Sequence, residues 1–188
     1  FTGGIGDTAF KDCKKIKGLT FESDSLSYIG QYAFENCDSL EGDLDLPMES
    51  GGDIYSHAFY NCKGLNGTLS LGSVGYIGNA AFRECSNIIG SLTIPSECET
   101  LDYACFNDAG FDGSLYFEDY QTSYTTNLNI EDYAFRNCGF KGDLVISGNE
   151  RIRKIDHYAF ENCKFSNQLV LPESIEVIGN SAFRGCSE

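Results

Sequence analysis

Cysteine is the residue type with the most evident capacity for chemistry in this chain of 188 residues, and it occurs nine times. An odd number of cysteines cannot pair completely within one chain. Seven of them share one position of a recurring Ala-Phe-x-x-Cys string, and a variant of the string has Ala109 there. Because free cysteine often fills small buried spaces, its exchange for alanine predicts structural thiols. The seven are Cys13, Cys37, Cys62, Cys85, Cys138, Cys163 and Cys186.

The other two cysteines, Cys98 and Cys105, stand where other repeats have apolar residues, and we predict that they too lie in the core. A disulfide between them and a metal site are the alternatives. A structural zinc site needs Cys-x₂₋₄-Cys pairs that converge on one ion, and the chain has no such pair.

Histidine and acidic residues show no catalytic spacing. His57 and His157 lie 100 residues apart, and neither stands beside a candidate nucleophile, so we predict surface histidines and no catalytic residue. Asp43, Asp45 and Asp143 could offer oxygens to Ca²⁺, but that ion needs six to eight, and neighbouring repeats have Ser or Thr in these places. We therefore expect solvated carboxylates, with no cofactor and no metal.

The charge of the chain excludes several function classes. Thirteen basic and 28 acidic residues give a net charge of −15, the opposite of a nucleic-acid-binding surface and unfavourable next to an anionic membrane. No stretch approaches the ~20 apolar residues that cross a bilayer, so we expect no membrane insertion in this segment. The chain starts without Met and without a basic or apolar leader, and we expect that any targeting segment has been removed.

A repeat must position all of these residues. Successive phenylalanines of the string lie 24, 25, 23, 24, 29, 25 and 23 residues apart, within the 20–29 residues of a leucine-rich repeat. We expect them to form one buried stack. They are Phe10, Phe34, Phe59, Phe82, Phe106, Phe135, Phe160 and Phe183.

Each repeat predicts the same sequence of elements. Leu44 and Leu46 alternate with polar residues, which is typical of a short strand with one buried face, and Pro47 ends it. A second extended segment and a short helical turn should follow. Glycine or asparagine two places before the strand predicts a left-handed corner. These residues are Gly42, Gly67, Gly90, Gly113, Gly142 and Asn167.

Because no single repeat can bury its own apolar face, the repeats must stack. We predict one solenoid domain over residues 1–188, with about seven coils and a partial eighth, and expect it to be a segment of a longer protein.

The pattern Ile-Gly-x-x-Ala-Phe-x-x-Cys, followed by a strand, a proline and an apolar pair, resembles the BspA-like leucine-rich repeats over essentially the whole chain. The resemblance implies an α/β repeat, a right-handed solenoid with a parallel sheet on one face, short second strands and short helical turns. It also implies an extracellular or cell-surface protein of a host-associated bacterium or a protist parasite, often an adhesin for host matrix proteins. It supplies no catalytic residue.

We predict that the outward strand positions bind a protein ligand. They change from Asp43 and Asp45 to Tyr116, Val145 and Val170, and exposed apolar rows indicate contact with a partner. Strand propensity alone is the alternative explanation for the two valines. The acidic residues would attract a basic ligand.

The irregular segment 118–127 supplies two further candidates, Tyr120 and Tyr124. Its Tyr, Ser and Thr content is typical of binding loops, whereas a tolerated insertion without function is the alternative.

Three functions fit this organisation to different degrees. The first is a non-enzymatic, adhesin-like binding module, and the second is a structural spacer or repetitive surface antigen. A graded row of outward residues favours the first. A polysaccharide-cleaving parallel β-helix would need clustered acids and bases, and the Ala-Phe turn argues against it.

Overall fold

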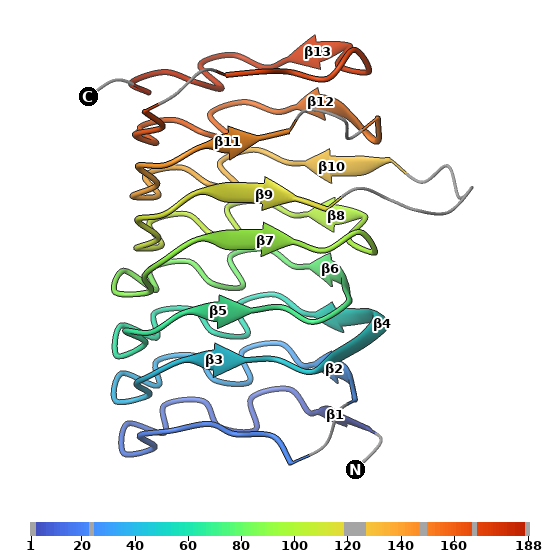
Figure 1. Ribbon diagram of the computed structural model, residues 1–188. Coiled ribbons are helices and arrows are strands. Elements are labelled where there is room, and N and C mark those ends of the chain that lie inside the picture. The colour runs from blue at the N-terminus through green and yellow to red at the C-terminus, as the bar shows by residue number, and fades with distance from the viewer. Residues whose placement is uncertain (1–2, 23–24, 119–126, 147–149, 167–168, 187–188) are drawn as a thin grey trace.

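The computed structural model is a stack of coils in which short strands recur on two sides (Figure 1). It describes residues 3–22, 25–118, 127–146, 150–166 and 169–186. The strands are β1 (Gly3–Ile5), β2 (Leu26–Ile29), β3 (Leu44–Asp45), β4 (Met48–Ile54), β5 (Leu69–Ser70), β6 (Val74–Ile77), β7 (Leu92–Ile94), β8 (Thr100–Leu101), β9 (Leu115–Phe117), β10 (Leu128–Ile130), β11 (Leu144–Val145), β12 (Ile152–Ile155) and β13 (Val177–Ile178).

The two sides differ in the continuity of their parallel sheets. The second extended segments form one eight-stranded sheet in the order β1-β2-β4-β6-β8-β10-β12-β13. The segments that precede them, on which the sequence analysis placed the main sheet, form only β3-β5 and β11-β9-β7. The continuous sheet is therefore formed by the second strands. The expectation that the first strands form the main sheet and the second strands are minor is wrong.

The turn around each Ala-Phe pair is not helical, and the described residues contain no helix, so the α/β assignment is wrong. In residues 32–37 the N–H groups alternate between two kinds of acceptor. Those of Tyr32, Phe34 and Asn36 donate to the next coil, at 3.0, 2.7 and 3.0 Å. The N–H groups of Ala33, Glu35 and Cys37 donate instead to the carbonyl oxygen three residues earlier in the same turn. A helix would direct every N–H along its own segment, whereas this turn binds two coils together.

Each turn contains two left-handed residues, one two places before the phenylalanine and one just before the cysteine. Tyr32 and Asn36, with φ of 58° and 59°, are examples, and they recur from Thr8 to Ser181. Asparagine adopts this conformation readily. Its amides also form ladders between coils, from Asn61 to Asn36 to Asp12 and, separately, from Asn162 to Asn137 to Asp108.

The eight phenylalanines form the predicted stack, with neighbouring ring centroids 4.9–5.4 Å apart and nearly parallel rings. The six inner rings are fully buried. The end rings are not: Phe10 is 38% exposed and Phe183 is half-buried, because each has a neighbouring ring on one side only. The prediction that all eight lie buried is therefore wrong at the two ends.

A second aromatic stack lies against the first in the later coils. Phe111, Phe140 and Phe165 stack at 5.3 and 5.6 Å. They follow the first-stack phenylalanine by five residues, whereas the earlier coils have the buried Leu40, Leu65 and Ile88 six residues after it.

The predicted left-handed corner occurs only in part. Gly42 and Gly90 have φ of +88° and +84°, but Gly67, Gly113 and Gly142 do not lie in the left-handed region. At these three a Cβ would come within 2.2–2.5 Å of the preceding coil. Glycine is required there by close approach of the coils. Asn167 lies outside the described residues.

Candidate binding face

The predicted outward residues do lie side by side on the sheet β11-β9-β7. Thr93 is paired with Tyr116, Tyr116 with Val145, and Val145 with Val170 through an isolated bridge. Tyr116 and Val170 are 40% and 45% exposed, and Val145 is half-buried. Asp45 continues the same repeat position on β3, where it is paired with Ser70. The row is thus contiguous from Thr93 to Val170, and its acidic end belongs to a separate two-stranded sheet.

Asp43 has a structural partner in the next coil. Its Oδ1 accepts hydrogen bonds from the backbone N–H and the hydroxyl of Thr68, at 2.8 and 2.9 Å. These bonds, that of the backbone first, hold the pKa of Asp43 below its usual value. Asp43 therefore links two coils, whereas Asp45 is exposed and free of such a bond among the described residues.

A cavity beside this face was not predicted from the sequence. It has a volume of about 280 Å³ and lies where β5 approaches β7, and its lining includes Ser70, Ser91, Thr93, Pro95 and Glu118. Hydroxyl groups recur in these repeat positions, and that recurrence was the available signal. Tyr120 and Tyr124 lie outside the described residues.

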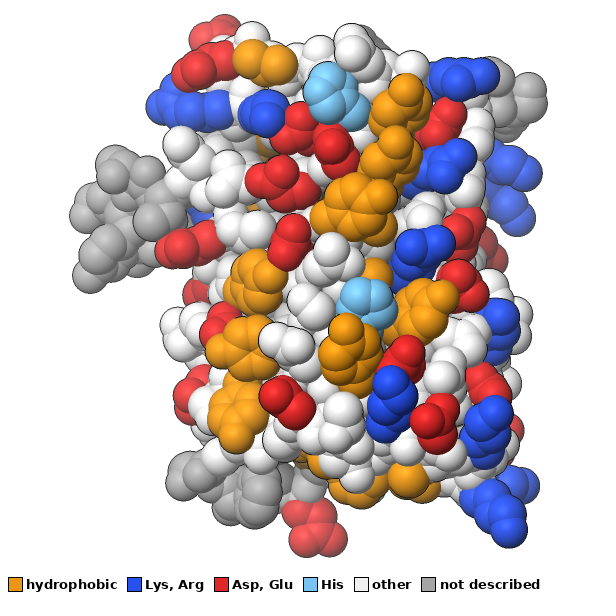
Figure 2. Space-filling view, turned by 180° about the vertical axis from the view of Figure 1, so that it is seen from behind, with side chains coloured by type: hydrophobic (Ala, Val, Ile, Leu, Met, Phe, Trp, Pro, Cys, Tyr) orange, Lys and Arg blue, Asp and Glu red, His pale blue; other side chains and the backbone are white. Residues whose placement is uncertain are grey.

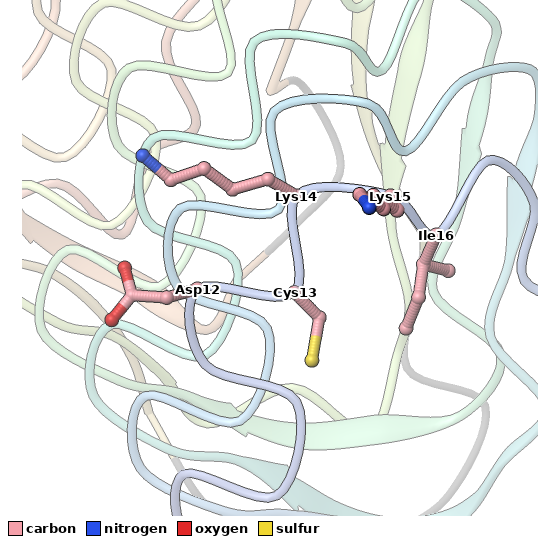
Figure 3. A pocket seen from close by; sticks show the side chains of 5 residues that line it. All are labelled: Asp12, Cys13, Lys14, Lys15 and Ile16. Atoms are coloured by element: carbon pink, nitrogen blue, oxygen red, sulfur yellow. The ribbon is translucent and has the colours of Figure 1, made fainter.

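The first coil has a second hollow, of about 520 Å³ (Figure 3). Cys13 and Ile16 point toward the same space, whereas Asp12 and Lys14 extend away from it. Cys13 and Ile16 occupy core positions and pack against the core while staying half-buried. The hollow is an uncovered part of the core, and we assign no ligand to it.

His157 is brought close to two carboxylates that its place in the sequence did not predict. Its ring, Asp132 and Asp156 offer atoms within 4.8 Å of one another. Each already has a partner: Lys154 lies 2.5 Å from Asp156, the N–H of Asn180 donates to His157 Nδ1, and Asp132 accepts the N–H of His157. We therefore assign no metal to this group.

His57 is less exposed than predicted. Its ring stacks on Tyr32 at 5.0 Å and meets Tyr60 edge-on, and its Nδ1 is buried. Burial lowers the pKa of His57, so that the neutral imidazole is favoured at pH 7.

All nine cysteines are free thiols, as predicted, and seven are fully buried. In the turns the thiol donates to the carbonyl of the preceding coil's phenylalanine, as Cys85 does to Phe59 at 3.1 Å. Burial raises the pKa of Cys85 and of Cys98 to about 12. Thiols with such pKa values are unreactive at neutral pH, because the thiolate is the nucleophile.

We therefore expect alkylation without prior reduction to label nearly all nine cysteines of the denatured protein, as counted by mass spectrometry. In the folded protein at pH 7, labelling should be confined to Cys13 and Cys186, which are half-buried. If several pairs of cysteines in the denatured protein are alkylated only after reduction, they form disulfides, and this assignment is wrong.

Comparison with known proteins adds the family. Six copies of a family model described as the BspA type leucine rich repeat region match residues 3–112 and 108–188. A search among curated proteins returned no match. A leucine-rich repeat protein from Bacteroides ovatus, known from a crystal structure, is 17% identical, with a TM-score of 0.40 over 97% of this chain and 68% of its own. No helix in the described part is long and apolar enough to span a membrane. Since the family model matches nearly every residue, the chain belongs to the BspA-type leucine-rich repeat family.

Proposed function

We propose that this chain is a non-enzymatic, adhesin-like binding module at the cell surface or outside the cell, and that its ligand is a protein of the host extracellular matrix. The observation that carries the proposal is the contiguous outward row of Thr93, Tyr116, Val145 and Val170. Leucine-rich repeats typically bind proteins, and repeats of this type are typically associated with surfaces.

The chemistry of the row supports an interface. Tyr116 presents a ring that is 40% exposed, and the two valines continue an apolar strip that the core does not require. Tyrosine is enriched among the residues that contribute most to binding energy. At the other end of the face, Asp45 adds negative charge, which favours a basic ligand and makes association depend on salt. The right-handed course of the coils is part of the same proposal, and it stays a prediction.

The test is binding to a panel of immobilised matrix proteins, collagen and laminin among them, followed by two variants with each protein that binds. Tyr116→Ala and Val145→Asp should each weaken binding by about tenfold or more, since the first removes the ring and the second places a charge in the apolar strip.

Two matched variants serve as controls. Tyr103→Ala removes a similarly exposed ring from the turn that follows β8, and Val177→Asp places a charge on the exposed strand β13. Both should bind as the parent does. If Tyr116→Ala and Val145→Asp remain folded and bind equally well, the site lies elsewhere. A chain that binds no member of the panel would favour the structural spacer.

A further inference from the structure

The outer side of the eight-stranded sheet carries a second set of aromatic and acidic side chains. Figure 2 shows this side. Hydrophobic side chains form columns on it, acidic side chains lie among and beside them, and most Lys and Arg lie toward the edges. The pairing of β2, β4 and β6 sets Asp53 between Tyr28 and Tyr76. Tyr55 lies 6.3 Å from each of these rings and donates a 3.0 Å hydrogen bond to Asp53. A carboxylate is thus surrounded by three tyrosines.

A cavity of about 250 Å³ opens next to this group. Gly51 and Gly75 form part of its lining. The two residues lie so close together that a Cβ added to Gly75 would be 2.8 Å from the Cα of Gly51. The register of β4 against β6 shifts at the neighbouring position, between Gly52 and Asp53. Because two successive coils lack a side chain here, the sheet surface is hollowed where other coils would fill it.

The lining of the cavity is strongly negative. Asp53, Glu97 and Glu99 contribute three carboxylates. Glu97 accepts a hydrogen bond from Ser96, and Asp53 accepts the one from Tyr55. Within the described ranges, none of the ion pairs formed by Lys, Arg or His involves these three residues. The buried guanidinium of Arg151 donates to the carbonyl groups of Ser96 and Cys98, on either side of Glu97, but it forms no ion pair with the three carboxylates within the described ranges. Three carboxylates next to one buried guanidinium leave the lining net negative.

The lining also contains an aromatic ring that is held in place. Tyr76 is half-buried, and its hydroxyl donates a 2.6 Å hydrogen bond to Asp102. Since the hydroxyl is held, the ring is fixed in place, and Tyr76 is one of the residues that line the cavity. Aromatic rings attract organic cations through their negative faces. The lining thus combines the two groups that bind ammonium and guanidinium ions.

We propose that this cavity receives a lysine or arginine side chain of a partner protein. Asp53, Glu97 and Glu99 do not gather their oxygens within 4.8 Å as metal ligands would, so the spacing favours a larger, organic cation. A side chain with a long apolar stem and a charged end matches a hollow with a glycine floor, a tyrosine wall and carboxylates. The net charge of −15 would attract a basic partner to the protein, and the three carboxylates would hold it at this cavity. The site is separate from the face of Tyr116 and does not depend on what that face binds.

The probe for this site is a capped pentapeptide with one lysine between pairs of glycines. Titration into ¹⁵N-labelled protein should shift the amide signals of Gly51, Gly75 and Thr100 in a saturable manner. The same peptide with an acetylated lysine is its neutral counterpart and should leave these signals unchanged. Signals of Tyr116 and Val145, on the other face, should not move with either peptide.

Two variants test the residues. Asp53→Asn combined with Glu97→Gln and Glu99→Gln should weaken binding by about tenfold. Gly51→Asn should weaken it at least as much, because it fills the hollow without a change of charge. A Cβ on Gly51 meets no atom within 4 Å, and asparagine accepts its φ of +76°.

The matched control removes three exposed carboxylates elsewhere, by Glu22→Gln, Glu41→Gln and Glu173→Gln. It should bind the lysine peptide within about twofold of the parent at 0.15 M salt, where distant charges are screened. Equal weakening by the control would show that net charge alone attracts the peptide and would overturn the proposal. So would unshifted signals of Gly51 and Gly75, or unchanged binding to a folded Gly51→Asn protein.

Discussion

Replacing Phe82 with alanine should lower the free energy of unfolding by about 3–5 kcal/mol. The ring is fully buried and stacks between Phe59 and Phe106, at 5.1 and 5.2 Å. Its removal leaves a cavity that nearly parallel rings on both sides, fixed by the hydrogen bonds of their own turns, cannot close. Chemical denaturation followed by far-ultraviolet circular dichroism measures the change.

Phe10→Ala is the matched variant, because it removes the same ring from the same repeat position. That ring is 38% exposed and has a neighbour on one side only. Its loss should cost about 1 kcal/mol, since less area leaves water and little cavity remains. Equal costs at both positions would contradict a continuous stack in which burial decides the contribution.

Gly110→Ala should be the second most destabilising of the changes considered, at about 3 kcal/mol, the upper range for an overfilled core. A Cβ on Gly110 would lie 2.2 Å from the carbonyl oxygen of Ser86 and 2.6 Å from its carbon. Both atoms belong to the backbone of the preceding coil, and so neither can move aside without displacing that coil. The measurement is the same denaturation experiment.

Gly18→Ala is the control for this change. A Cβ at Gly18 meets no atom within 4 Å, and its φ is not in the left-handed region. Alanine should therefore be neutral or stabilise the fold by up to ~1 kcal/mol, through the reduced freedom of the unfolded chain. A Gly110→Ala protein as stable as the Gly18→Ala protein would show that the coils can separate at little cost.

The period of the chain was readable from the sequence because each coil must repeat its core residues. Phe34, Phe59 and their equivalents can stack only if every coil returns its core residues to the same place, so that differences in coil length are confined to the segments between core positions. The small residue after the turn followed from the same requirement, since Cys and Ala exchange where space is limited. This information sufficed for the solenoid and its buried thiols.

The conformation of the turns was not readable. Tyr32, His57 and Ala80 share one left-handed position although their side chains differ widely, so residue type carries no signal there. The conformation is imposed by hydrogen bonds to the next coil, which only the assembled stack supplies. A single repeat, considered alone, resembles a short helical turn.

The candidate sites divide in the same way. Tyr116, Val145 and Val170 share a repeat position, and the register alone brings them together. The acidic cavity depends on a register shift next to Gly52 coinciding with glycines at Gly51 and Gly75 and with carboxylates of two different coils, a combination that the repeat pattern does not specify. Features that follow the repeat can be predicted from it, whereas features that depart from it need the structure.

The asparagine ladder has a consequence for how the solenoid transmits stress. It is interrupted between Asn61 and Asp108, because Glu84 occupies the intervening position and has no amide to donate. Three of the five buried side-chain atoms without a hydrogen-bond partner among the described residues belong to the coils at this interruption: Asn61 Oδ1, Asn107 Oδ1 and Arg83 Nε, the last of which lies 3.8 Å from Glu84. The continuous sheet, the phenylalanine stack and the backbone hydrogen bonds all cross this coil, so it lacks only the side-chain link between its neighbours. A pull on one turn is therefore passed across this coil by the backbone and the rings alone, without the amides that share it elsewhere.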